Sequence, residues 1–441
     1  MILYRSTRQP NAKPEEHTIF PEALRLGLAP DGGLYIPDQV PAYTPDFWHN
    51  IAGMSVSELG RILLLPWLED DLSDDIFEPL INDALNFDAP LVRLSEYTYV
   101  LELFHGPTLA FKDFAARTMG RLMAQLLRKP GETLHVLTAT SGDTGAAVAD
   151  GFFGVEGIHV WVLYPSGKVS ALQEKQFTTL GGNVTALEVD GTFDDCQRLV
   201  KQAFSDEALR ARMNLTSANS INIGRLLPQM VYYARALAQL QEQGIGEPPV
   251  FIVPSGNFGN LTAGVLAFLM GMPVGGYVAA TNQNKTFVDF IETGRYEPRP
   301  SIRTISNAMD VGDPSNFERI FDLCGRDHKS IKAGILADFV NDDDTRACIL
   351  QTWKEFGYIA DPHTAVGLKA WERKRSDFIE DTTGVVLATA HPAKFGDVMP
   401  DEVSKHITLP PALEKLQSRT KKSTAMPASF EAFRELLTKA V

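Results

Sequence analysis

The chain has 441 residues, of which 44% are hydrophobic and 22% charged, and this composition is typical of a globular protein with two or three domains. Its apolar content excludes global disorder, and its formal charge of −14 argues against a protein that wraps nucleic acid or lies on an anionic membrane. The three cysteines lie far apart, so they predict neither a disulfide framework nor a structural zinc site and indicate a reducing compartment.

No secretory or transit segment is predicted at the start of the chain, where Met1–Tyr4 leads directly into Arg5 and Arg8. The uncharged stretch Leu261–Ala280 is barely long enough to cross a membrane. Its glycines and Pro273 instead predict a short helix, a turn and a strand. We therefore expect a cytoplasmic protein that contacts neither a membrane nor nucleic acid.

The first ninety residues are rich in proline, so we predict a separate and more irregular N-terminal domain at residues 1–90. After about residue 130, by contrast, predicted strands and helices alternate. The strands are Leu134–Thr140, Ile158–Tyr164, Val184–Val189, Val250–Val253 and Val385–Ala388. The helices are Ala146–Phe153, Ala171–Leu180, Phe193–Phe204 and a later one that carries Leu227, Val231, Ala234 and Ala238.

This alternation predicts an α/β fold with mainly parallel twisted sheets and helices on both faces. We assign residues 91–410 to this α/β domain and residues 411–441 to a C-terminal tail, in which a linker at Ser418–Lys422 precedes a final helix. Ligands of such sheets bind at the carboxyl ends of the strands. The turns that follow the strands are therefore where a functional site is expected.

The turn after the strand Val250–Val253 reads Pro254-Ser255-Gly256-Asn257-Phe258-Gly259-Asn260. Its glycines allow a ligand to approach the backbone, and the free N–H groups at the start of the next helix favour an anion such as phosphate. The turn matches neither a Walker A loop nor the Gly-x-Gly-x-x-Gly pattern. An ordinary tight turn is the alternative, and the turn alone leaves both readings open.

A second turn, Thr140-Ser141-Gly142-Asp143-Thr144-Gly145, also connects a strand to a helix. Its hydroxyls and exposed N–H groups suit a carboxylate or a phosphate. The alternative is that Asp143 or Thr144 only caps the helix. Two such turns on one sheet favour ligand binding more than one does.

Lys112 stands among apolar neighbours, which are Leu109, Ala110, Phe111 and Phe114. Burial lowers the pKa of a lysine and makes its amine nucleophilic toward an aldehyde. A surface lysine that pairs with Asp113 is the alternative.

A nucleophilic lysine, a phosphate cradle and a cradle for a carboxylate are the parts that an enzyme needs in order to use pyridoxal 5'-phosphate. The pyridine nitrogen of this cofactor also needs a partner, and the Thr389 hydroxyl, directly after the strand Val385–Ala388, is a candidate. A β-branched strand residue without a further role is the alternative for Thr389. These features together predict pyridoxal phosphate as the cofactor, and no metal.

At this point the chain resembles the threonine synthases, a pyridoxal phosphate-dependent family of fold type II. The segments that carry the resemblance are Gly27–Pro37, His105–Phe114, Ser141–Gly145, Pro254–Asn260, Ser306–Asp310 and Thr389–Phe395. They follow one another in the family's order over nearly the whole chain, and the likeness is least clear between about residues 320 and 345. Gln9, where the family commonly has glycine, is a departure that concerns only the N-terminal turn.

The resemblance implies conversion of O-phospho-L-homoserine and water to L-threonine and phosphate, by γ-elimination and β-addition of water. It implies that Lys112 holds the cofactor as a Schiff base and that Asp143 lies near the cofactor's 3'-oxygen, with Thr389 facing the pyridine nitrogen. The residues implied to bind the cofactor phosphate are Gly256, Asn257, Phe258, Gly259 and Asn260. Those implied to bind the substrate are Ser141, Gly142 and Thr144 for its carboxylate, and Ser220 and Arg225 for its phosphate.

Water has to enter at one step and be excluded earlier, so we expect a mobile small subdomain at about residues 134–225 that closes over the site.

A salt bridge at a helix start is the alternative role for Arg225. An amino acid dehydratase or a β-replacement synthase is the alternative enzyme, and a catalytically silent cofactor-binding protein is the alternative from another class. A monomer and a homodimer are both compatible with the sequence.

Overall fold

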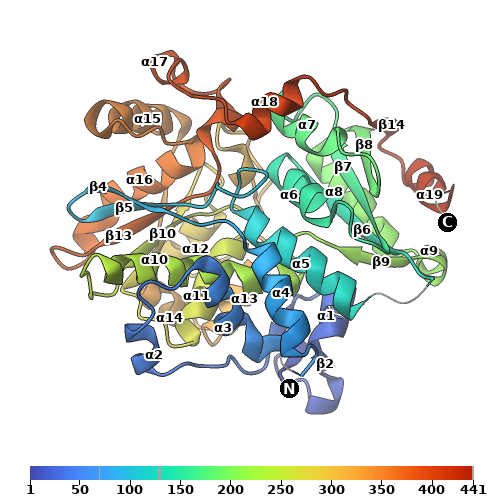
Figure 1. Ribbon diagram of the computed structural model, residues 1–441, viewed down its shortest axis with the longest axis horizontal. Coiled ribbons are helices and arrows are strands. Elements are labelled where there is room, and N and C mark those ends of the chain that lie inside the picture. The colour runs from blue at the N-terminus through green and yellow to red at the C-terminus, as the bar shows by residue number, and fades with distance from the viewer. Residues whose placement is uncertain (69, 128–130, 440–441) are drawn as a thin grey trace.

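A computed structural model of the protein describes residues 1–68, 70–127 and 131–439 (Figure 1). Its strands form three sheets, a small antiparallel one near the N-terminus and two larger ones that are mainly parallel. The prediction of an α/β fold with mainly parallel sheets is therefore confirmed. Within the described ranges, no helix combines the length and the apolar character that crossing a lipid bilayer requires.

The N-terminal region is more regular than its proline content predicts. Strand β1 (Leu3–Ser6) pairs antiparallel with β2 (Thr18–Ile19) and β3 (Tyr35–Pro37). The helices of this region are η1 (Pro14–Glu16), α1 (Phe20–Leu26), α2 (Pro45–His49), α3 (Val56–Leu68) and α4 (Asp74–Ala84). Pro66 and Pro79 lie inside α3 and α4, and the buried apolar faces of these helices pack into the main core. Tertiary packing thus outweighs the local cost of the prolines.

The large sheet has the strand order β12-β11-β10-β13-β5-β4 and is parallel except for its edge strand β4. Its strands are β4 (Leu91–Ser95), β5 (Thr98–Glu102), β10 (Val250–Pro254), β11 (Gly276–Thr281), β12 (Ile335–Phe339) and β13 (Gly384–Ala388). Along β13, Val385 and Leu387 face the main core, whereas Val386 and Ala388 face a second apolar cluster. Both faces of the sheet are therefore buried, which explains why its strands are continuous apolar runs.

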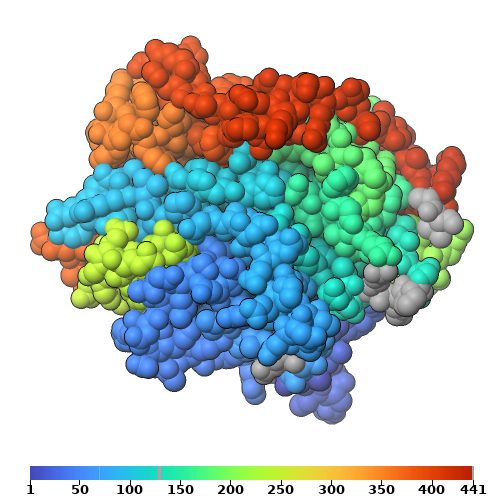
Figure 2. Space-filling view, in the orientation of Figure 1, coloured from blue at the N-terminus to red at the C-terminus, as the bar shows by residue number. Residues whose placement is uncertain are grey.

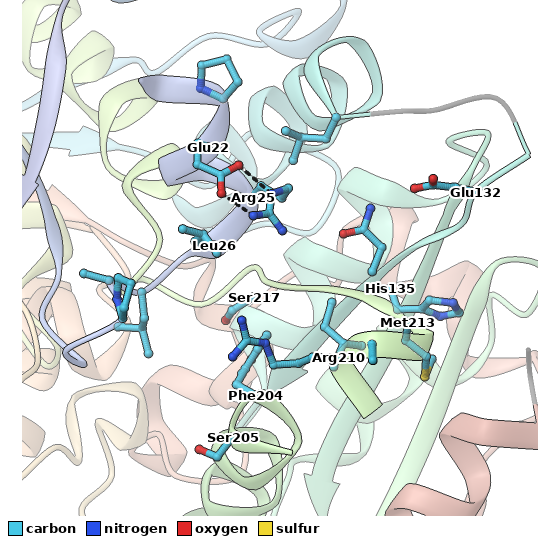
Figure 3. A pocket seen from close by; sticks show the side chains of 18 of the residues that line it. Glu22, Arg25, Leu26, Glu132, His135, Phe204, Ser205, Arg210, Met213 and Ser217 are labelled. Carbon is cyan, nitrogen blue, oxygen red and sulfur yellow. Dashed lines mark hydrogen bonds and ion pairs between the residues drawn. The ribbon is translucent and has the colours of Figure 1, made fainter. Parts of the chain in front are cut away.

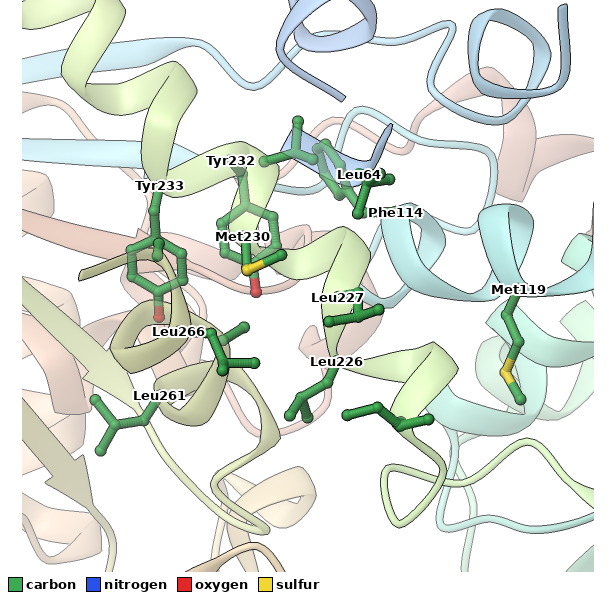
Figure 4. Packing of buried hydrophobic residues seen from close by; sticks show 14 of the residues in the cluster. Leu64, Phe114, Met119, Leu226, Leu227, Met230, Tyr232, Tyr233, Leu261 and Leu266 are labelled. Carbon is green, nitrogen blue, oxygen red and sulfur yellow. The ribbon is translucent and has the colours of Figure 1, made fainter. Parts of the chain in front are cut away.

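Helices α10 and α11 cover one face of the large sheet, and α15 and α16 cover the other. We call the large sheet and the helices packed around it the large domain. After residue 90, its helices are α5 (Lys112–Leu126), α10 (Met230–Glu242), α11 (Gly259–Leu269), α12 (Thr286–Thr293), α13 (Phe317–Leu323), α14 (His328–Gly334), α15 (Asp342–Phe356), α16 (Pro362–Lys374) and α17 (Asp401–Ser404). The 3-10 helices are η2 (Ile223–Arg225), η3 (Leu227–Gln229), η4 (Asn307–Met309), η5 (Arg375–Asp377) and η6 (Pro392–Phe395). Figure 4 shows Leu64, Phe114, Tyr232 and Leu266 gathered in the core between α3, α5, α10 and α11.

The small sheet is parallel throughout, in the order β14-β8-β7-β6-β9. Its strands are β6 (Leu134–Ala139), β7 (Ile158–Pro165), β8 (Val184–Asp190), β9 (Asn214–Ser217) and β14 (Thr424–Pro427). The helices around it are α6 (Asp143–Phe152), α7 (Ala171–Thr178), α8 (Phe193–Ser205), α9 (Glu207–Arg212), α18 (Pro411–Gln417) and α19 (Phe430–Lys439). The predicted strands at 134–140, 158–164 and 184–189 are thus confirmed.

The C-terminal segment differs from its prediction. It contains the predicted final helix, α19, but the residues after Ser418–Lys422 first form β14, which pairs with β8 at the edge of the small sheet. Figure 2 shows this segment as a red band along one side of the molecule, from the large domain to the small sheet. The strand was missed because it is only four residues long, ends in a proline and pairs on one side alone.

Candidate active site

A cavity of about 390 Å³ lies between the two parallel sheets, at the carboxyl ends of β6, β10 and β13. The predicted site residues that line it are Lys112, Ser141, Asp143, Thr144, Ser220, Arg225, Gly256, Asn257, Phe258, Gly259, Asn260 and Thr389. Gly142 is the predicted site residue that is not part of the lining: it is buried behind it, against the side chain of Gln173. Segments from five parts of the chain thus meet in one cavity, and the two turns come from different sheets, not from one sheet as predicted.

A larger cavity of about 1490 Å³ adjoins the first, between α1 and the helices and strands of the small sheet (Figure 3). The two cavities share Leu28, Phe204, Ser217 and Ile221. In the larger cavity Arg25 forms an ion pair with Glu22 (Figure 3). The lysine and both predicted turns lie in the smaller cavity, which we therefore treat as the candidate active site.

Lys112 is the first residue of α5, and its side chain is only 15% exposed. Its Nζ lies 3.8 Å from Asp143 Oδ2 and 4.8 Å from the centre of the Phe111 ring. Burial lowers the pKa of Lys112 to about 8; Asp143 opposes this shift, whereas Lys394 and Arg225 reinforce it. Lys112 therefore has a largely buried amine with a lowered pKa, as its apolar neighbours predict.

The alternative ion pair between Lys112 and Asp113 does not form. Asp113 turns away, because its carboxylate accepts hydrogen bonds from the Thr108 backbone N–H at 2.8 Å and from the Thr108 hydroxyl at 2.5 Å. Burial raises the pKa of Asp113 to about 6. Asp113 thus closes the loop that leads into α5, and Leu109 in that loop has a φ of 59°, a conformation that is uncommon outside glycine.

The chain on either side of Lys112 is tied to the segment around Thr389. The Phe111 N–H donates to the Thr389 carbonyl oxygen at 2.9 Å, and the His391 N–H donates to the Leu109 carbonyl oxygen at 3.1 Å. These bonds hold Lys112 and Thr389 at the same end of the large sheet, although they are far apart in sequence.

The glycine-rich turn leads from β10 into α11. Phe258 has a φ of 60° and occupies the N-cap position, and no side chain caps the helix. The first N–H groups of α11 are therefore available to an anion. A Cβ atom at Gly256 would lie 2.8 Å from both the Ala308 carbonyl oxygen and Met309 Cα, so only glycine allows this close approach of the two backbones.

Asn260, the last residue of this turn, has an unused donor. Its Oδ1 accepts hydrogen bonds from the hydroxyls of Tyr232 and Tyr233, both at 2.7 Å. Its Nδ2 is buried and has no partner among the described residues. Asn257, in contrast, donates to the Ser220 hydroxyl at 2.5 Å and accepts from the Ser315 N–H at 2.6 Å.

The second turn is organised by Thr140, not by the two residues that were considered as caps. Thr140 Oγ1 accepts hydrogen bonds from the backbone N–H groups of Gly142, at 2.9 Å, and Gly145, at 2.7 Å. The N-cap residue of α6 is Gly142, so Asp143 and Thr144 do not cap the helix. Neither side chain is used as a cap, and both residues line the cavity.

Asp143 lies beside two lysines. Its Oδ1 is 2.6 Å from Lys394 Nζ and accepts a hydrogen bond from Gln173 Nε2 at 2.9 Å, while its Oδ2 faces Lys112. Sequence reasoning assigned no role to Lys394 or Gln173. Lys394 stands in a segment that carries the family resemblance, but nothing in its local pattern indicates a partner more than two hundred residues away.

Arg225 is buried in η2, and its Nη1 donates to the Ala218 carbonyl oxygen at 2.6 Å. Its Nε has no acceptor in the described part of the chain. Burial lowers the pKa of Arg225 to about 10. The alternative salt bridge is not observed, since no carboxylate of the described residues lies within ion-pair distance of Arg225.

Ser220 is held in place by a residue that sequence reasoning missed. Arg319 is wholly buried and donates to the backbone carbonyls of Ser220, at 3.2 Å, and Ile221, at 2.7 Å. It also donates to the Tyr35 carbonyl oxygen at 2.9 Å, so it joins this loop to the N-terminal strand β3. No local sequence signal marks an arginine whose acceptors are backbone carbonyls from distant segments.

The cavity residues fit pyridoxal phosphate. Asn260 Nδ2 and Arg225 Nε are buried donors without acceptors among the described residues, and such groups call for anionic or carbonyl oxygens. Lys112 supplies an amine for the aldehyde, and a volume of about 390 Å³ falls in the range of small-molecule sites.

Family comparisons divide the chain into three matched segments. Residues 3–85 match the family described as "Threonine synthase N terminus", residues 85–390 match "Pyridoxal-phosphate dependent enzyme", and residues 364–437 match "Threonine synthase, C-terminal". Threonine synthase from Haemophilus influenzae is 41% identical, over 97% of this chain and 98% of its own length. The one from Escherichia coli is 40% identical, over 96% of this chain and 97% of its own. The chain belongs to the threonine synthase family.

Solved structures agree with this assignment. The crystal structure of threonine synthase from Escherichia coli has a TM-score of 0.90 and 39% identity, and the alignment covers the whole of both chains. The structure of pyridoxal phosphate-bound threonine synthase from Brucella melitensis has a TM-score of 0.92 and 36% identity, with 100% of this chain and 99% of that chain covered. The enzyme is therefore a fold type II, pyridoxal phosphate-dependent lyase of threonine biosynthesis.

Proposed function

We propose that the cavity around Lys112 is where O-phospho-L-homoserine and water are converted to L-threonine and phosphate. The observation that supports this most directly is the meeting of a buried amine with two buried, unused donors, Asn260 Nδ2 and Arg225 Nε, in one cavity. An amine suits the cofactor aldehyde, and two separate donors suit two separate phosphates. A fold type II enzyme whose substrate carries no phosphate needs only the donor for the cofactor phosphate and has no use for the second donor.

The positions of the cavity residues and the family resemblance together support a role for each residue. The turn Gly256–Asn260 holds the cofactor phosphate through the start of α11 and Asn260. By the family resemblance, Asp143 would lie next to the 3'-oxygen of bound pyridoxal phosphate, and the Thr389 hydroxyl would face its pyridine nitrogen. Ser141, Gly142 and Thr144 hold the substrate carboxylate at the start of α6, and Ser220 and Arg225 hold its phosphate.

Bound pyridoxal phosphate supplies the electron sink that no side chain offers. Lys112 Nζ acts as the base that removes the proton from the substrate Cα, and it then carries protons at Cβ and Cγ. Its pKa of about 8 suits this work, because a base is most effective when its pKa lies near the working pH. Arg225 stabilises the departing phosphate, whose charge grows as the bond to Cγ breaks.

We also propose a division of labour between domains, with an N-terminal domain at 1–90, a catalytic domain at 91–410 and a C-terminal segment at 411–441. Within the catalytic domain, residues of about 134–225 form a mobile subdomain that admits water after phosphate has left. Strands β6–β9 support this, since they pair in a sheet separate from the large one. Opening and closing of this subdomain would change access to the cavity that lies between the two parallel sheets.

The enzyme works, we propose, in the cytoplasm as a monomer or homodimer and acts on its small-molecule substrate without nucleic acid. All three cysteines are unpaired, and Cys196 and Cys348 are buried, as is typical of a protein from a reducing compartment.

The test is to incubate the purified protein with pyridoxal phosphate and O-phospho-L-homoserine. Inorganic phosphate and threonine should appear in equal amounts.

Lys112→Ala should abolish nearly all turnover, together with the borohydride-reducible visible absorbance of the cofactor, because no amine remains to bind it. Lys175→Ala is the control, since Lys175 lies outside the cavity and donates to the Gln417 carbonyl oxygen. Turnover of Lys112→Ala at the parent level would refute the role of Lys112, and absence of phosphate release from the parent would indicate a sensor.

A further inference from the structure

Lys394 is a wholly buried lysine beside the active site, in the short helix η6 that follows β13. Its Nζ lies 2.6 Å from Asp143 Oδ1 and donates to the Thr108 carbonyl oxygen at 2.9 Å. A buried ammonium group is costly unless it is both paired and hydrogen-bonded. These two contacts therefore determine where the Lys394 side chain lies, and they connect the large domain to the first residue of α6.

The Asp143 carboxylate accepts hydrogen bonds at one oxygen and forms a longer ion pair with Lys112 at the other. Lys394 Nζ and Gln173 Nε2 both bind Oδ1, at 2.6 and 2.9 Å. Oδ2 is 3.8 Å from Lys112 Nζ, too far for a hydrogen bond. Two donors on one oxygen set the plane of the carboxylate, and that plane directs Oδ2 toward Lys112.

Two lysines thus share one carboxylate, and the nearer one is not the nucleophile. If Lys394 were absent, Asp143 would have Lys112 as its nearest cation. An ion pair favours the charged form of a lysine, and a charged lysine can neither attack an aldehyde nor accept a proton.

The charged groups that act on Lys112 come from four elements: Asp143 on α6, Asp113 on α5, Lys394 on η6 and Arg225 on η2. Burial makes the largest contribution to the lowered pKa of Lys112, the two carboxylates oppose it, and the two cations reinforce it. Arg225 is engaged elsewhere, at the Ala218 carbonyl oxygen. Lys394 is the cation that contacts Asp143 itself.

We propose that Lys394 is a positioning residue: it holds the Asp143 carboxylate with one oxygen facing Lys112 Nζ, and it occupies the close, hydrogen-bonded position on Asp143 that Lys112 would otherwise take. The inference rests on the proposed function, because it presupposes the roles of Lys112 and Asp143. It adds a residue of the large domain that acts on the nucleophile through a side chain of the small one.

The test measures the titration of Lys112 itself, in the full-length chain freed of cofactor. Acetic anhydride modifies only neutral amines, so the labelling of Lys112 against pH, read by mass spectrometry relative to the exposed Lys13, gives a midpoint. In the parent this midpoint should lie near 8. In Lys394→Met, a change that keeps length and removes charge, it should rise by about one pH unit or more.

Two controls separate charge from structure. Lys394→Arg keeps the cation and should keep the parent midpoint, a rescue that a purely steric role would not produce. Lys175→Met removes another lysine that donates to a backbone carbonyl, and it should leave the midpoint unchanged. Equal midpoints in the parent and Lys394→Met would overturn the inference.

A double variant serves if Lys394→Met alone does not fold. Asp143→Asn combined with Lys394→Met leaves neither ion unpaired. Relative to Asp143→Asn, the double variant should titrate Lys112 at nearly the same pH, because the carboxylate through which Lys394 acts is absent from both; a midpoint higher by about one pH unit or more would show that Lys394 acts on Lys112 directly and would contradict the proposal. Lys112→Ala distinguishes the two levels of inference. If it keeps the visible absorbance of the cofactor, the proposed function fails; if it loses that absorbance while Lys394→Met titrates like the parent, only the role of Lys394 fails.

Discussion

Arg225 carries a positive charge into a buried position without a carboxylate beside it in the described ranges. One of its N–H groups is used by the Ala218 carbonyl oxygen, and its Nε is unused. Although burial lowers its pKa, a value of about 10 leaves the guanidinium charged at neutral pH. Such a group is poised for an anion that arrives with the substrate, since a guanidinium binds phosphate oxygens in a forked geometry.

Replacing Arg225 with alanine should therefore raise KM for O-phospho-L-homoserine by about 10–100-fold, the equivalent of roughly 1.5–3 kcal/mol for a hydrogen bond to a charged group. Steady-state kinetics with phosphate release as the readout measure this. Arg198→Ala is the matched control, because Arg198 is an exposed arginine of α8 that pairs with Asp195. An unchanged KM would contradict the proposed role of Arg225 in binding the substrate phosphate. It would favour a dehydratase or a β-replacement enzyme, which needs no phosphate site for its substrate.

At the scale of elements, the crossing of α5 and α6 brings Lys112 and Asp143 close together. Lys112 begins α5 and Asp143 begins α6. Where the helices cross, a Cβ atom on Gly151 would lie 2.8 Å from the Ala116 carbonyl carbon, and one on Gly120 would lie 2.7 Å from the Gly151 carbonyl oxygen. The two backbones touch, and only glycine permits this approach.

Gly151→Ala should force the two helices apart and lower the free energy of unfolding by about 1–3 kcal/mol, the usual cost of overpacking. Urea titration followed by circular dichroism measures the change. Gly334→Ala is the control, because Gly334 is also helical and a Cβ atom there would meet nothing within 4 Å. Equal effects of the two substitutions would show that the close crossing of α5 and α6 does not matter for stability.

At the scale of the whole molecule, the C-terminal segment ties the large domain to the small sheet. It leaves the large domain after α17, packs α18 on α7, adds β14 to β8 and places α19 on α8. Lys421 forms ion pairs with Glu174 and Glu188 along the way. The last contact is apolar, since Phe433 and Leu437 are buried in the cluster beneath α8.

Phe433→Ala should loosen this attachment, because removing a buried phenylalanine costs about 3–5 kcal/mol. The loss should be local to the small sheet, so hydrogen exchange should speed up in α8 and β8 and remain unchanged in α16. Glu435→Ala, on the exposed side of the same helix, is the control. Exchange that rises equally in both domains would contradict a role confined to the small sheet.

Local patterns were enough for much of the fold and for the core of the candidate site. Strands β6, β7, β8, β10 and β13 are apolar runs bounded by turns, and buried parallel strands show that pattern whatever their neighbours are. Lys112 and the two turns after β6 and β10 could be recognised because glycines, hydroxyls and an apolar setting act within a few residues. In contrast, α3 and α4 were missed, because Pro66 and Pro79 suggest breaks that packing against the core overcomes.

The sequence by itself determined that a lysine in apolar surroundings and two strand-to-helix turns rich in glycine and hydroxyl groups exist, because each depends on residues adjacent in the chain. Only the tertiary structure decided which groups meet them. Asp113, next to Lys112, binds Thr108, whereas Asp143 approaches Lys112 from another helix, and Lys394 pairs with Asp143 from the far end of the chain. The physical reason is that the energy of a buried charge depends on every group within a few ångströms, and in a folded chain those groups come from anywhere in the sequence.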